Sequence, residues 1–479
     1  MITKLLKASS LTLGIWAVAL SPSGALTLKE AVDEALTSNP EILQSIQNRE
    51  AVEFELRQAR GLYLPTLDLE ASAGQRGLDS PGRRRLGTED ETLDAADVGL
   101  TFRQTLFDGG ARRAEVERQA SRVDGASFRV AERSEAIALA VTQEYFEIML
   151  QHELVAIARR NVSELQGIVS DISQGVSGGT LTSADRMQGN ERVLSARARL
   201  NEAEEDLEQA QIRFLRLVGV RPSSLQSPPS VAKALPRSVT EAVEIARRQS
   251  PRIAAAGADV DAADALARGA KSSYLPVISF EAKARVGSDI DGAEGRTSDL
   301  EAKVVARWNL YRGGRDLAAE QERIRRASES RMQNVLVHRE VQESIQSAWD
   351  KRRKRAEQAS LLREQASASG SLVSSYRDQF RVGERSLLDV LGAQNTRFNT
   401  QVLAKTAQYA AIYADYQALA AMGSLVQAFN LAAAPQAEAY ARDEFKAIST
   451  SEVEPVYTRL PSRQVSGAPF DLLAPVRTN

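Results

Sequence analysis

The sequence contains no cysteine and only two histidines in 479 residues. The lack of cysteine excludes disulfides, thiolate metal sites, cysteine nucleophiles and lipid attachment to an N-terminal cysteine. With only His152 and His338 available, an imidazole-based metal cluster is disfavoured as well. Lys and Arg number 61 against 63 Asp and Glu, so the formal charge of −2 gives no electrostatic reason to bind nucleic acid. We therefore expect no enzyme, no cofactor, no metal site and no nucleic-acid partner.

Long apolar runs are missing beyond the N-terminus. Lys4 and Lys7 precede an apolar run at 11–20, and small residues follow up to Ala25. This pattern predicts a signal peptide over 1–25, because the run is about half as long as a membrane-spanning helix requires. We expect a mature protein in the periplasm, in the secreted space, or in an outer membrane entered as β-strands.

The second half of the chain repeats the first. A shift of 211 positions makes 15 of the 44 residues from 30 to 73 identical, where an alanine-rich composition would give roughly 3 or 4 by chance. After a variable segment, 74–95 against 285–298, the shift becomes 204 and holds to the end of both halves. Length changes of this kind occur in loops. The sequence therefore predicts a tandem duplication.

Each repeat is predicted to contain a helix, two strands, a long helix and a return helix. The first repeat, 26–220, has a helix at 28–62 with a break at Pro40, a strand pair within 66–107 (strands 66–73 and 97–107), a long helix at 111–176 and a return helix at 183–217. A linker at 221–237 leads to the second repeat, 238–430, with a strand pair within 277–311 (strands 277–286 and 299–311), a long helix at 315–380 and a return helix at 388–428. Residues 431–479 are proline-rich and are predicted to be a flexible periplasmic tail.

Particular residues mark the turns between these elements. A residue before proline is pushed out of the helical region, and glycine pairs stop a strand. The predicted structural turn residues are Tyr63, Pro65, Tyr274, Pro276, Gly109, Gly110, Gly313, Gly314 and Gly383.

The strands alternate between apolar and polar residues. In 277–286, Ile278 and Phe280 alternate with Ser279 and Glu281. A soluble sheet would also have one apolar face. The length of about 9 to 11 residues and the aromatic residues near the strand ends favour tilted membrane-spanning strands instead. Four strands cannot close a barrel and open edges are not tolerated in lipid, so several chains would have to share one barrel.

The long helices contain no proline and very little glycine. Sixty-six residues at 1.5 Å each give a rod of about 100 Å. Apolar residues recur at spacings of three and four, as in Ile137, Val141 and Tyr145, while charged residues occupy the remaining faces. We expect coiled-coil-like pairs rather than a globular domain.

The order of helices and strands, repeated twice along the chain, resembles that of the TolC family of outer-membrane efflux and secretion ducts. The motifs that carry the resemblance are Tyr-Leu-Pro before each strand pair, Leu-Phe-Asp-Gly-Gly and Leu-Tyr-Arg-Gly-Gly at the strand exits, and the turn from Phe380 to Ala393. The resemblance covers about residues 26–430. It implies a mainly α protein with membrane β-structure: a homotrimeric 12-stranded β-barrel, four strands per chain, continuing into a long periplasmic α-helical barrel.

The resemblance also implies a function and a location. The protein would be the outer-membrane exit duct of a tripartite system for multidrug efflux or type I secretion. It would be a passive conduit that contacts outer-membrane lipid and is opened by a periplasmic adaptor (membrane fusion protein) and an inner-membrane transporter of RND or ABC type. A periplasmic coiled-coil scaffold or adaptor without a pore is the alternative, although it would not need paired amphipathic strands.

The family places its periplasmic closure at the second helix turn. Carried over, Arg385 would pair with Asp185 as a latch, with Phe380 as its aromatic neighbour, and Asp389 would form a constricting ring. Phe380 stands where the founding member of the family has Tyr, and Gly392 stands where it has a second Asp, which leaves a second acidic ring open. Ordinary solvated charges at a helix turn are the competing interpretation of Arg385 and Asp389.

Overall fold

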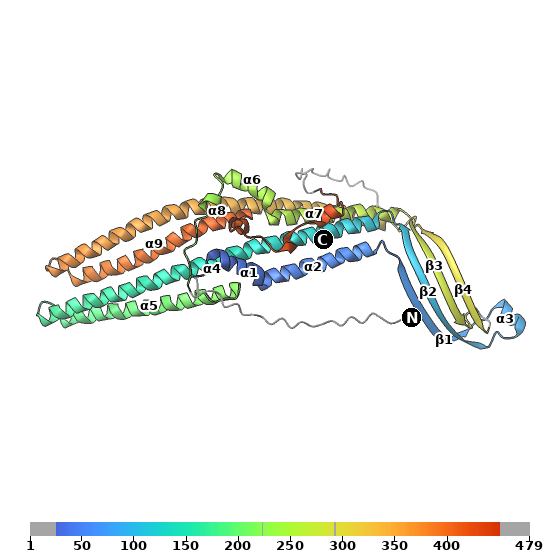
Figure 1. Cartoon of the computed structure of the whole chain (residues 1–479), viewed down its shortest axis with the longest axis horizontal. Helices are drawn as coiled ribbons and strands as arrows, with labels where there is room; N and C mark the ends of the chain where they lie inside the picture. Colours follow the sequence, from blue (N-terminus) through green and yellow to red (C-terminus); the bar gives the residue numbers. More distant parts are fainter. Residues whose placement is uncertain (1–24, 223, 292–293, 451–479) are drawn as a thin grey trace, which may run out of the picture.

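The computed structural model describes residues 25–222, 224–291 and 294–450. It is a long rod of helices with a β-sheet at one end (Figure 1). Nearly all of the expected signal peptide, and the end of the chain from residue 451, lie outside the described residues.

The first repeat contains two short helices, two strands and a long helical hairpin. Its elements are α1 (Leu28–Ser38), α2 (Pro40–Gly61), β1 (Thr66–Gly77), α3 (Pro81–Leu86), β2 (Thr92–Phe107), α4 (Ala111–Ser177) and α5 (Ser183–Val218). Asn39 separates α1 from α2 because it caps both: its N–H ends α1, and its side chain accepts a hydrogen bond from the Glu41 N–H. The short α3 lies in the loop that varies between the repeats, where no helix was predicted.

The second repeat has the same order of elements. They are α6 (Val239–Gln249), α7 (Pro251–Gly269), β3 (Val277–Ser288), β4 (Arg296–Arg307), α8 (Arg315–Arg381), α9 (Leu387–Met422) and α10 (Leu425–Ala428), followed by α11 (Ala441–Glu444). Short 3₁₀ turns occur at Ala232–Ala234, Ala270–Tyr274 and Pro435–Ala437.

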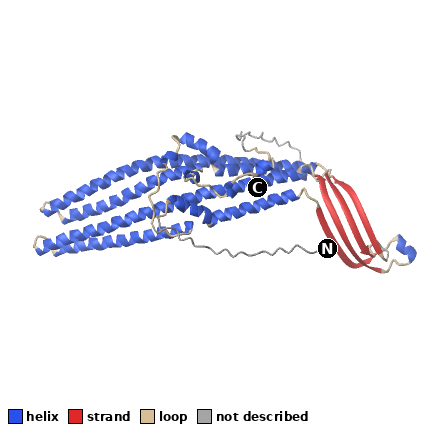
Figure 2. Ribbon diagram, in the orientation of Figure 1, coloured by secondary structure: helices blue, strands red, loops and turns tan. Residues whose placement is uncertain are grey.

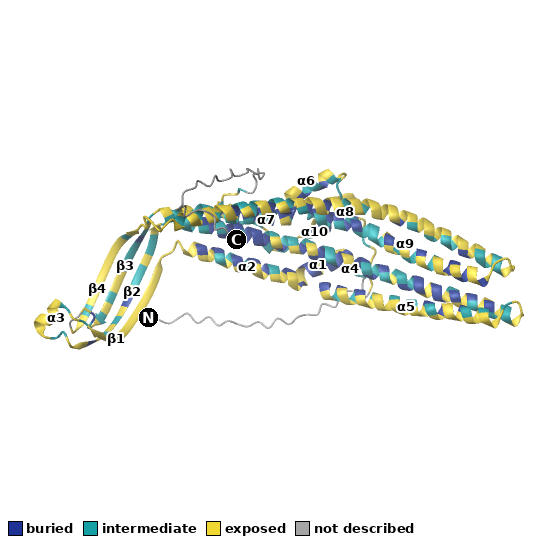
Figure 3. Ribbon diagram, turned by 180° about the vertical axis from the view of Figure 1, so that it is seen from behind, coloured by how far each residue is buried: buried dark blue, intermediate teal, exposed yellow. Residues whose placement is uncertain are grey.

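The two hairpins, α4 with α5 and α8 with α9, run side by side away from the sheet. Each of α4 and α8 has 67 residues, about 100 Å at 1.5 Å per residue. The main apolar core lies in the middle of the rod, where α1, α6 and α10 pack against the long helices. Figure 3 shows buried residues concentrated along α4 and the helices beside it. The helix α8 buries far fewer residues than α4, so one side of it is uncovered in the single chain.

The four strands form one antiparallel sheet in the order β1-β2-β3-β4 (Figure 2). Directly paired residues share a face of a sheet. One row across it is Leu69, Leu100, Ala284 and Leu300, and the next row is Glu70, Gly99, Arg285 and Asp299. The sheet therefore has one apolar and one charged face, as the alternation predicted.

The strand ends differ from those predicted. Both β1 and β2 extend further into the variable loop, and β3 is two residues longer. In contrast, β4 ends at Arg307 rather than at 311. The Trp308 indole donates a hydrogen bond to the Tyr274 carbonyl at 3.1 Å, which turns the chain toward the helices.

The return helix of the second repeat is shorter than predicted. Gly423 has a φ of +72° and ends α9, and a separate turn, α10, follows. A Cβ at Gly423 would lie 2.7 Å from Pro251 Cδ, because the start of α7 packs against this glycine. The helical spacing of apolar residues continues past Gly423, so the sequence pattern did not predict this break.

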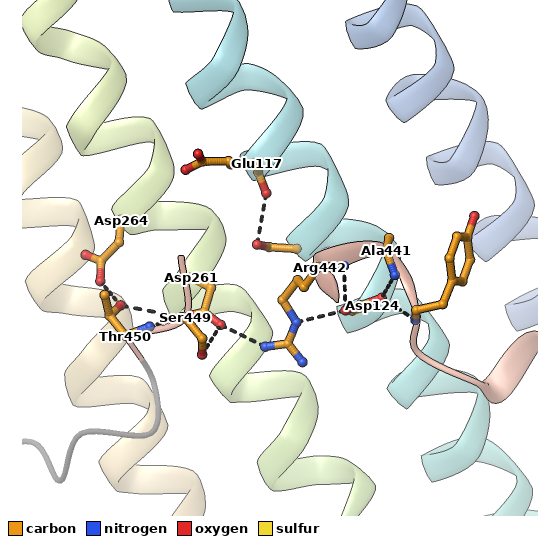
Figure 4. A network of polar contacts seen from close by, with 10 residues as sticks. Glu117, Asp124, Asp261, Asp264, Ala441, Arg442, Ser449 and Thr450 are labelled. Atoms are coloured by element: carbon orange, nitrogen blue, oxygen red, sulfur yellow. Dashed lines mark hydrogen bonds and ion pairs between the residues drawn. The ribbon is translucent and has the colours of Figure 1, made fainter. Parts of the chain in front are cut away.

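The prediction of a flexible tail from residue 431 is wrong for residues 431–450. This segment crosses α4 and α7 and is held by buried carboxylates (Figure 4). Asp124 accepts hydrogen bonds from the Tyr440, Ala441 and Arg442 N–H groups. The Arg442 guanidinium also contacts Asp261, which accepts a hydrogen bond from the Thr450 N–H.

The predicted linker also makes defined contacts. Leu225 forms an isolated parallel bridge with Leu26, and the Tyr145 hydroxyl lies 2.7 Å from the Leu26 carbonyl oxygen and 2.6 Å from that of Gln226. In the part of the chain that the structure describes, no helix combines the length and the apolar character needed to cross a membrane.

Candidate functional site

The candidate site lies at the helical tips, at the end of the rod far from the sheet. The turn between α4 and α5 contains Gly179, with a φ of +77°, and the turn between α8 and α9 contains Gly383, with a φ of +80°. Both positions require the left-handed region, which glycine adopts without steric cost. The two turns are therefore equivalent structures in the two repeats, 204 residues apart.

The two predicted aspartates occupy equivalent positions in these turns. The Asp185 carboxylate accepts hydrogen bonds from the Thr182 N–H at 2.9 Å and from the Thr182 hydroxyl at 2.8 Å. Asp389 accepts from the Ser386 N–H at 3.4 Å and from its hydroxyl at 2.8 Å. Each pair is a capping box that begins a return helix. The Thr182 N–H, followed by its hydroxyl, lowers the pKa of Asp185.

Arg385 lies on the α8–α9 turn and contacts its own hairpin. Its Nε donates a hydrogen bond to Gln379 Oε1 at 3.0 Å, and its guanidinium lies 4.2 Å from the centre of the Tyr376 ring. Its Nη1 is 4.0 Å from Asp389 Oδ2. Within the described residues of a single chain, Arg385 and Asp185 are not paired.

Phe380 belongs to the apolar cluster behind the tips. It packs with Tyr376 against residues of α4, α5 and α9, among them Ile172 and Val390. The ring thus stabilises the hairpin from inside. Phenylalanine suits this place because no hydroxyl has to be hydrogen-bonded there.

Polar contacts that the sequence did not reveal join the two hairpins. Arg397 Nη1 contacts Glu164 Oε2 at 2.9 Å, and Gln394 Nε2 donates to the same carboxylate at 2.5 Å and to Asn161 Oδ1 at 3.0 Å. Arg377 of α8 lies 4.0 Å from Asp171 of α4. These residues lie among other charged helix residues, so no local pattern sets them apart.

At the opposite end of the rod, the predicted turn residues connect the helices to the sheet. Gly109, Gly110, Gly313 and Gly314 all have positive φ, and the second glycine of each pair precedes a long helix. The Tyr63 ring, two residues before Pro65, lies under the Arg112 guanidinium at 4.8 Å. The Tyr274 hydroxyl, two residues before Pro276, donates to Glu320 at 2.9 Å.

The apolar face of the sheet is a second candidate surface. Leu69 is 73% exposed and Leu300 is 82% exposed, and no described segment of the chain covers them. On the other face the charges are paired, as in Arg285 with Asp97 at 2.9 Å. Elsewhere in the described residues, no group of three or more His, Asp or Glu is arranged to hold a metal ion.

Comparison with known proteins identifies this arrangement. Residues 31–220 and 242–445 match the family described as outer membrane efflux protein. The outer membrane efflux protein BepC of Brucella suis is 24% identical over 400 residues, which are 83% of this chain and 86% of BepC. The alkaline protease secretion protein AprF of Pseudomonas aeruginosa is 23% identical over 395 residues, which are 80% of this chain and 82% of AprF.

The fold comparison agrees. The crystal structure of CusC matches with a TM-score of 0.72 and 18% identity, over 82% of this chain and 91% of that chain. The fold is thus that of the TolC-like channels, and the predicted resemblance is confirmed. The family is one of transport proteins of the outer membrane. Because the family match spans most of both repeats, the chain belongs to the outer membrane efflux protein family.

Proposed function

We propose that three copies of this chain form the outer-membrane exit duct of a tripartite export system. The observation that carries the proposal is the sheet, whose continuous apolar face is uncovered while its other face is charged. An exposed apolar surface of this kind marks contact with lipid or with another protein. Outer-membrane lipid covers it in the proposed duct.

The edges of the sheet support a shared barrel. In the described chain, β1 and β4 each pair on one side only. Backbone groups left unpaired in lipid cost several kcal/mol each, and about eight strands are needed to close a barrel. Pairing of β4 with β1 of the next copy would close twelve strands from three chains.

Exposed apolar residues on the helices also support contacts between adjacent copies of the chain. On α5, Met187 and Leu194 are exposed and seven residues apart, and on α8, Leu361 and Leu372 are exposed and eleven apart. Spacings of seven and eleven place residues on one side of a helix. These two uncovered stripes lie on helices at the edges of the chain, where adjacent copies would meet to close a tunnel of twelve helices.

The duct would be passive and would depend on partners for opening. The names of the relatives cover both efflux, for BepC, and protease secretion, for AprF. We propose that a periplasmic adaptor and an inner-membrane transporter, of RND or ABC type, bind the tip end and select the cargo.

The tips would close the duct. We propose that Arg385 pairs with Asp185 of the adjacent hairpin across a chain boundary, and that three Asp389 carboxylates form a constricting ring. Carboxylates about 6 Å apart repel by roughly 0.7 to 3 kcal/mol per pair, which favours cations over anions. Charge-assisted hydrogen bonds of about 1.5 to 3 kcal/mol each, in three copies, would hold the tips together.

Planar-bilayer conductance of the detergent-purified protein, together with its mass in solution, tests the duct. We expect discrete single-channel steps from a particle of about three times the chain mass. A monomer or dimer without conductance would overturn the proposal.

Cross-linking tests the latch, because the chain has no native cysteine. With Asp185→Cys and Arg385→Cys in one chain, oxidation should link chains into dimers and trimers on denaturing gels. Asp185→Cys with Lys354→Cys is the control, since residue 354 lies about 40 Å along α8 from the tip. Conducting trimers that never cross-link between chains would contradict the latch.

A further inference from the structure

The two helical tips differ at three neighbouring positions. At the shift of 204, Ile172, Gly175 and Leu181 of the first repeat correspond to Tyr376, Gln379 and Arg385 of the second. The backbone around these positions is alike, with a glycine of positive φ and a capping box in each turn. The duplication therefore allows two equivalent turns of one chain to be compared: the tip of the first repeat is apolar at these positions, and the tip of the second repeat is polar.

In the first repeat the tip is closed by apolar packing. Ile172 is fully buried, and Leu181 packs against the same cluster. A Cβ added at Gly175 would lie 2.7 Å from Leu181 Cδ1, so the leucine fits only because residue 175 has no side chain. At these three positions the first tip has no charged side chain that could move from one binding partner to another.

In the second repeat the same three positions hold a cation. The Tyr376 ring lies beneath the Arg385 guanidinium at 4.2 Å, and Gln379 Oε1 accepts from Arg385 Nε at 3.0 Å. The aromatic ring thus binds the planar face of the guanidinium, and the amide oxygen binds one N–H at its edge. Tyr376 and Gln379 are neutral and do not cancel the charge of Arg385; the carboxylate beside it is Asp389, whose Oδ2 lies 4.0 Å from Arg385 Nη1.

The carboxylate that would compete for Arg385 is accessible. Both capping hydrogen bonds to Asp185 go to Oδ2. Within the described residues, Oδ1 accepts none, and Asp185 is only half-buried. A guanidinium that leaves Tyr376 can therefore pair with Asp185 without breaking the cap of α5.

We propose that Tyr376 and Gln379 form a holding site for Arg385 in the unlatched state, and that Arg385 alternates between this site and the Asp185 carboxylate. The proposal rests on the latch proposed above and adds the residues that set its strength. Tyr376 is then a positioning residue: it lowers the occupancy of the latch by offering Arg385 another partner. The first repeat, with leucine in place of arginine, is the fixed side of the gate.

Single-channel recording on a two-by-two set of variants tests this: wild type, Tyr376→Leu, Arg385→Ala and the double variant. Loss of the ring should shift Arg385 toward Asp185 and lower the ratio of open to closed time by about two- to fivefold per chain, as expected for one exposed cation–π contact. Arg385→Ala should raise that ratio. In the Arg385→Ala background, Tyr376→Leu should have no further effect.

Tyr376→Phe is the matched control, because it keeps the ring face and should behave as the wild type. Thermal unfolding of each variant identifies loss of packing in the apolar cluster. If Arg385→Ala raises the open ratio but Tyr376→Leu changes nothing, the holding site is wrong and the latch stands. If Arg385→Ala changes nothing, both are wrong. An effect of Tyr376→Leu that persists without Arg385 would show a structural role only and overturn the holding site.

Discussion

Arg442 binds the Asp124 carboxylate twice, through its main-chain N–H at 3.1 Å and through its Nε at 2.8 Å. Asp124 is 3% exposed, so this carboxylate is nearly removed from water. Arg442 then reaches Asp261 of α7 at 2.7 Å. The segment after the second repeat thus ties a helix of the first repeat to a helix of the second.

Asp124→Ala should destabilise the folded protein strongly. The change removes the acceptor for three main-chain N–H groups and leaves a guanidinium with one buried partner fewer. Breaking a buried ion pair costs about 3 to 5 kcal/mol. The midpoint of thermal unfolding, followed by circular dichroism in detergent, measures this loss, and tryptic cleavage near Arg442 should become faster.

Asp443→Ala is the control for that change, because Asp443 lies on the exposed side of the same short helix. It should alter the free energy of unfolding by less than about 0.5 kcal/mol. Equal effects of the two substitutions would contradict the assignment of Asp124 as the anchor.

The helices and strands could be predicted from local signals, but this anchor could not. Pro40 and the glycine pairs set element boundaries through backbone sterics, which act between neighbours in sequence. Asp124 and Arg442 are more than three hundred residues apart, and each is an ordinary charged residue in its own segment. Proline content in 431–479 therefore predicted a flexible tail where the structure has a docked one in residues 431–450.

The candidate site was predictable in its position and only partly in its contacts. The serine and threonine three residues before Asp389 and Asp185 form a capping signature that the sequence shows. The contact of Arg385 with Tyr376 depends on the side-chain rotamers and on the turn at Gly383. Sequence spacing alone does not determine those.

A lysine at Leu69 should prevent stable insertion of the sheet. A cation on the lipid face near the bilayer midplane costs about 2 to 4 kcal/mol. We expect less trimer in the outer-membrane fraction and a lower denaturant midpoint in detergent. Ser72→Lys is the control on the charged face, where Asp97 lies directly opposite in register. Equal trimer yields from both variants would show that the apolar face does not contact lipid.

Glu135 should make stability depend on pH. It accepts hydrogen bonds from the Leu425 and Val426 N–H groups, and burial raises its pKa from 4.5 to about 7. An acid whose folded-state pKa is raised is protonated more readily when folded, so its contribution to stability is lost as pH rises from about 4.5 to 7. The loss is on the order of 3 kcal/mol.

The measurement compares unfolding midpoints of the wild type and Glu135→Gln between pH 5 and pH 8. The difference should move in favour of the glutamine variant as pH rises, because glutamine does not ionise. Glu132→Gln, close by on α4 with a side chain that is 44% exposed, is the control and should keep a constant offset. A constant offset for Glu135→Gln as well would mean that Glu135 does not titrate in this range.

Aspartate at Gly392 should add a second acidic ring to the duct without disturbing the fold. A Cβ at this position meets nothing within 4 Å, and Gly392 lies inside α9, where glycine is a poorer helix former than aspartate. Three added carboxylates, one turn from Asp389, should increase the preference for cations over anions, measured as the reversal potential in a salt gradient. Gly392→Asn, which adds the same volume without charge, should leave the reversal potential unchanged. A shift of equal size for both variants would mean that pore geometry, rather than charge, sets selectivity at the tips.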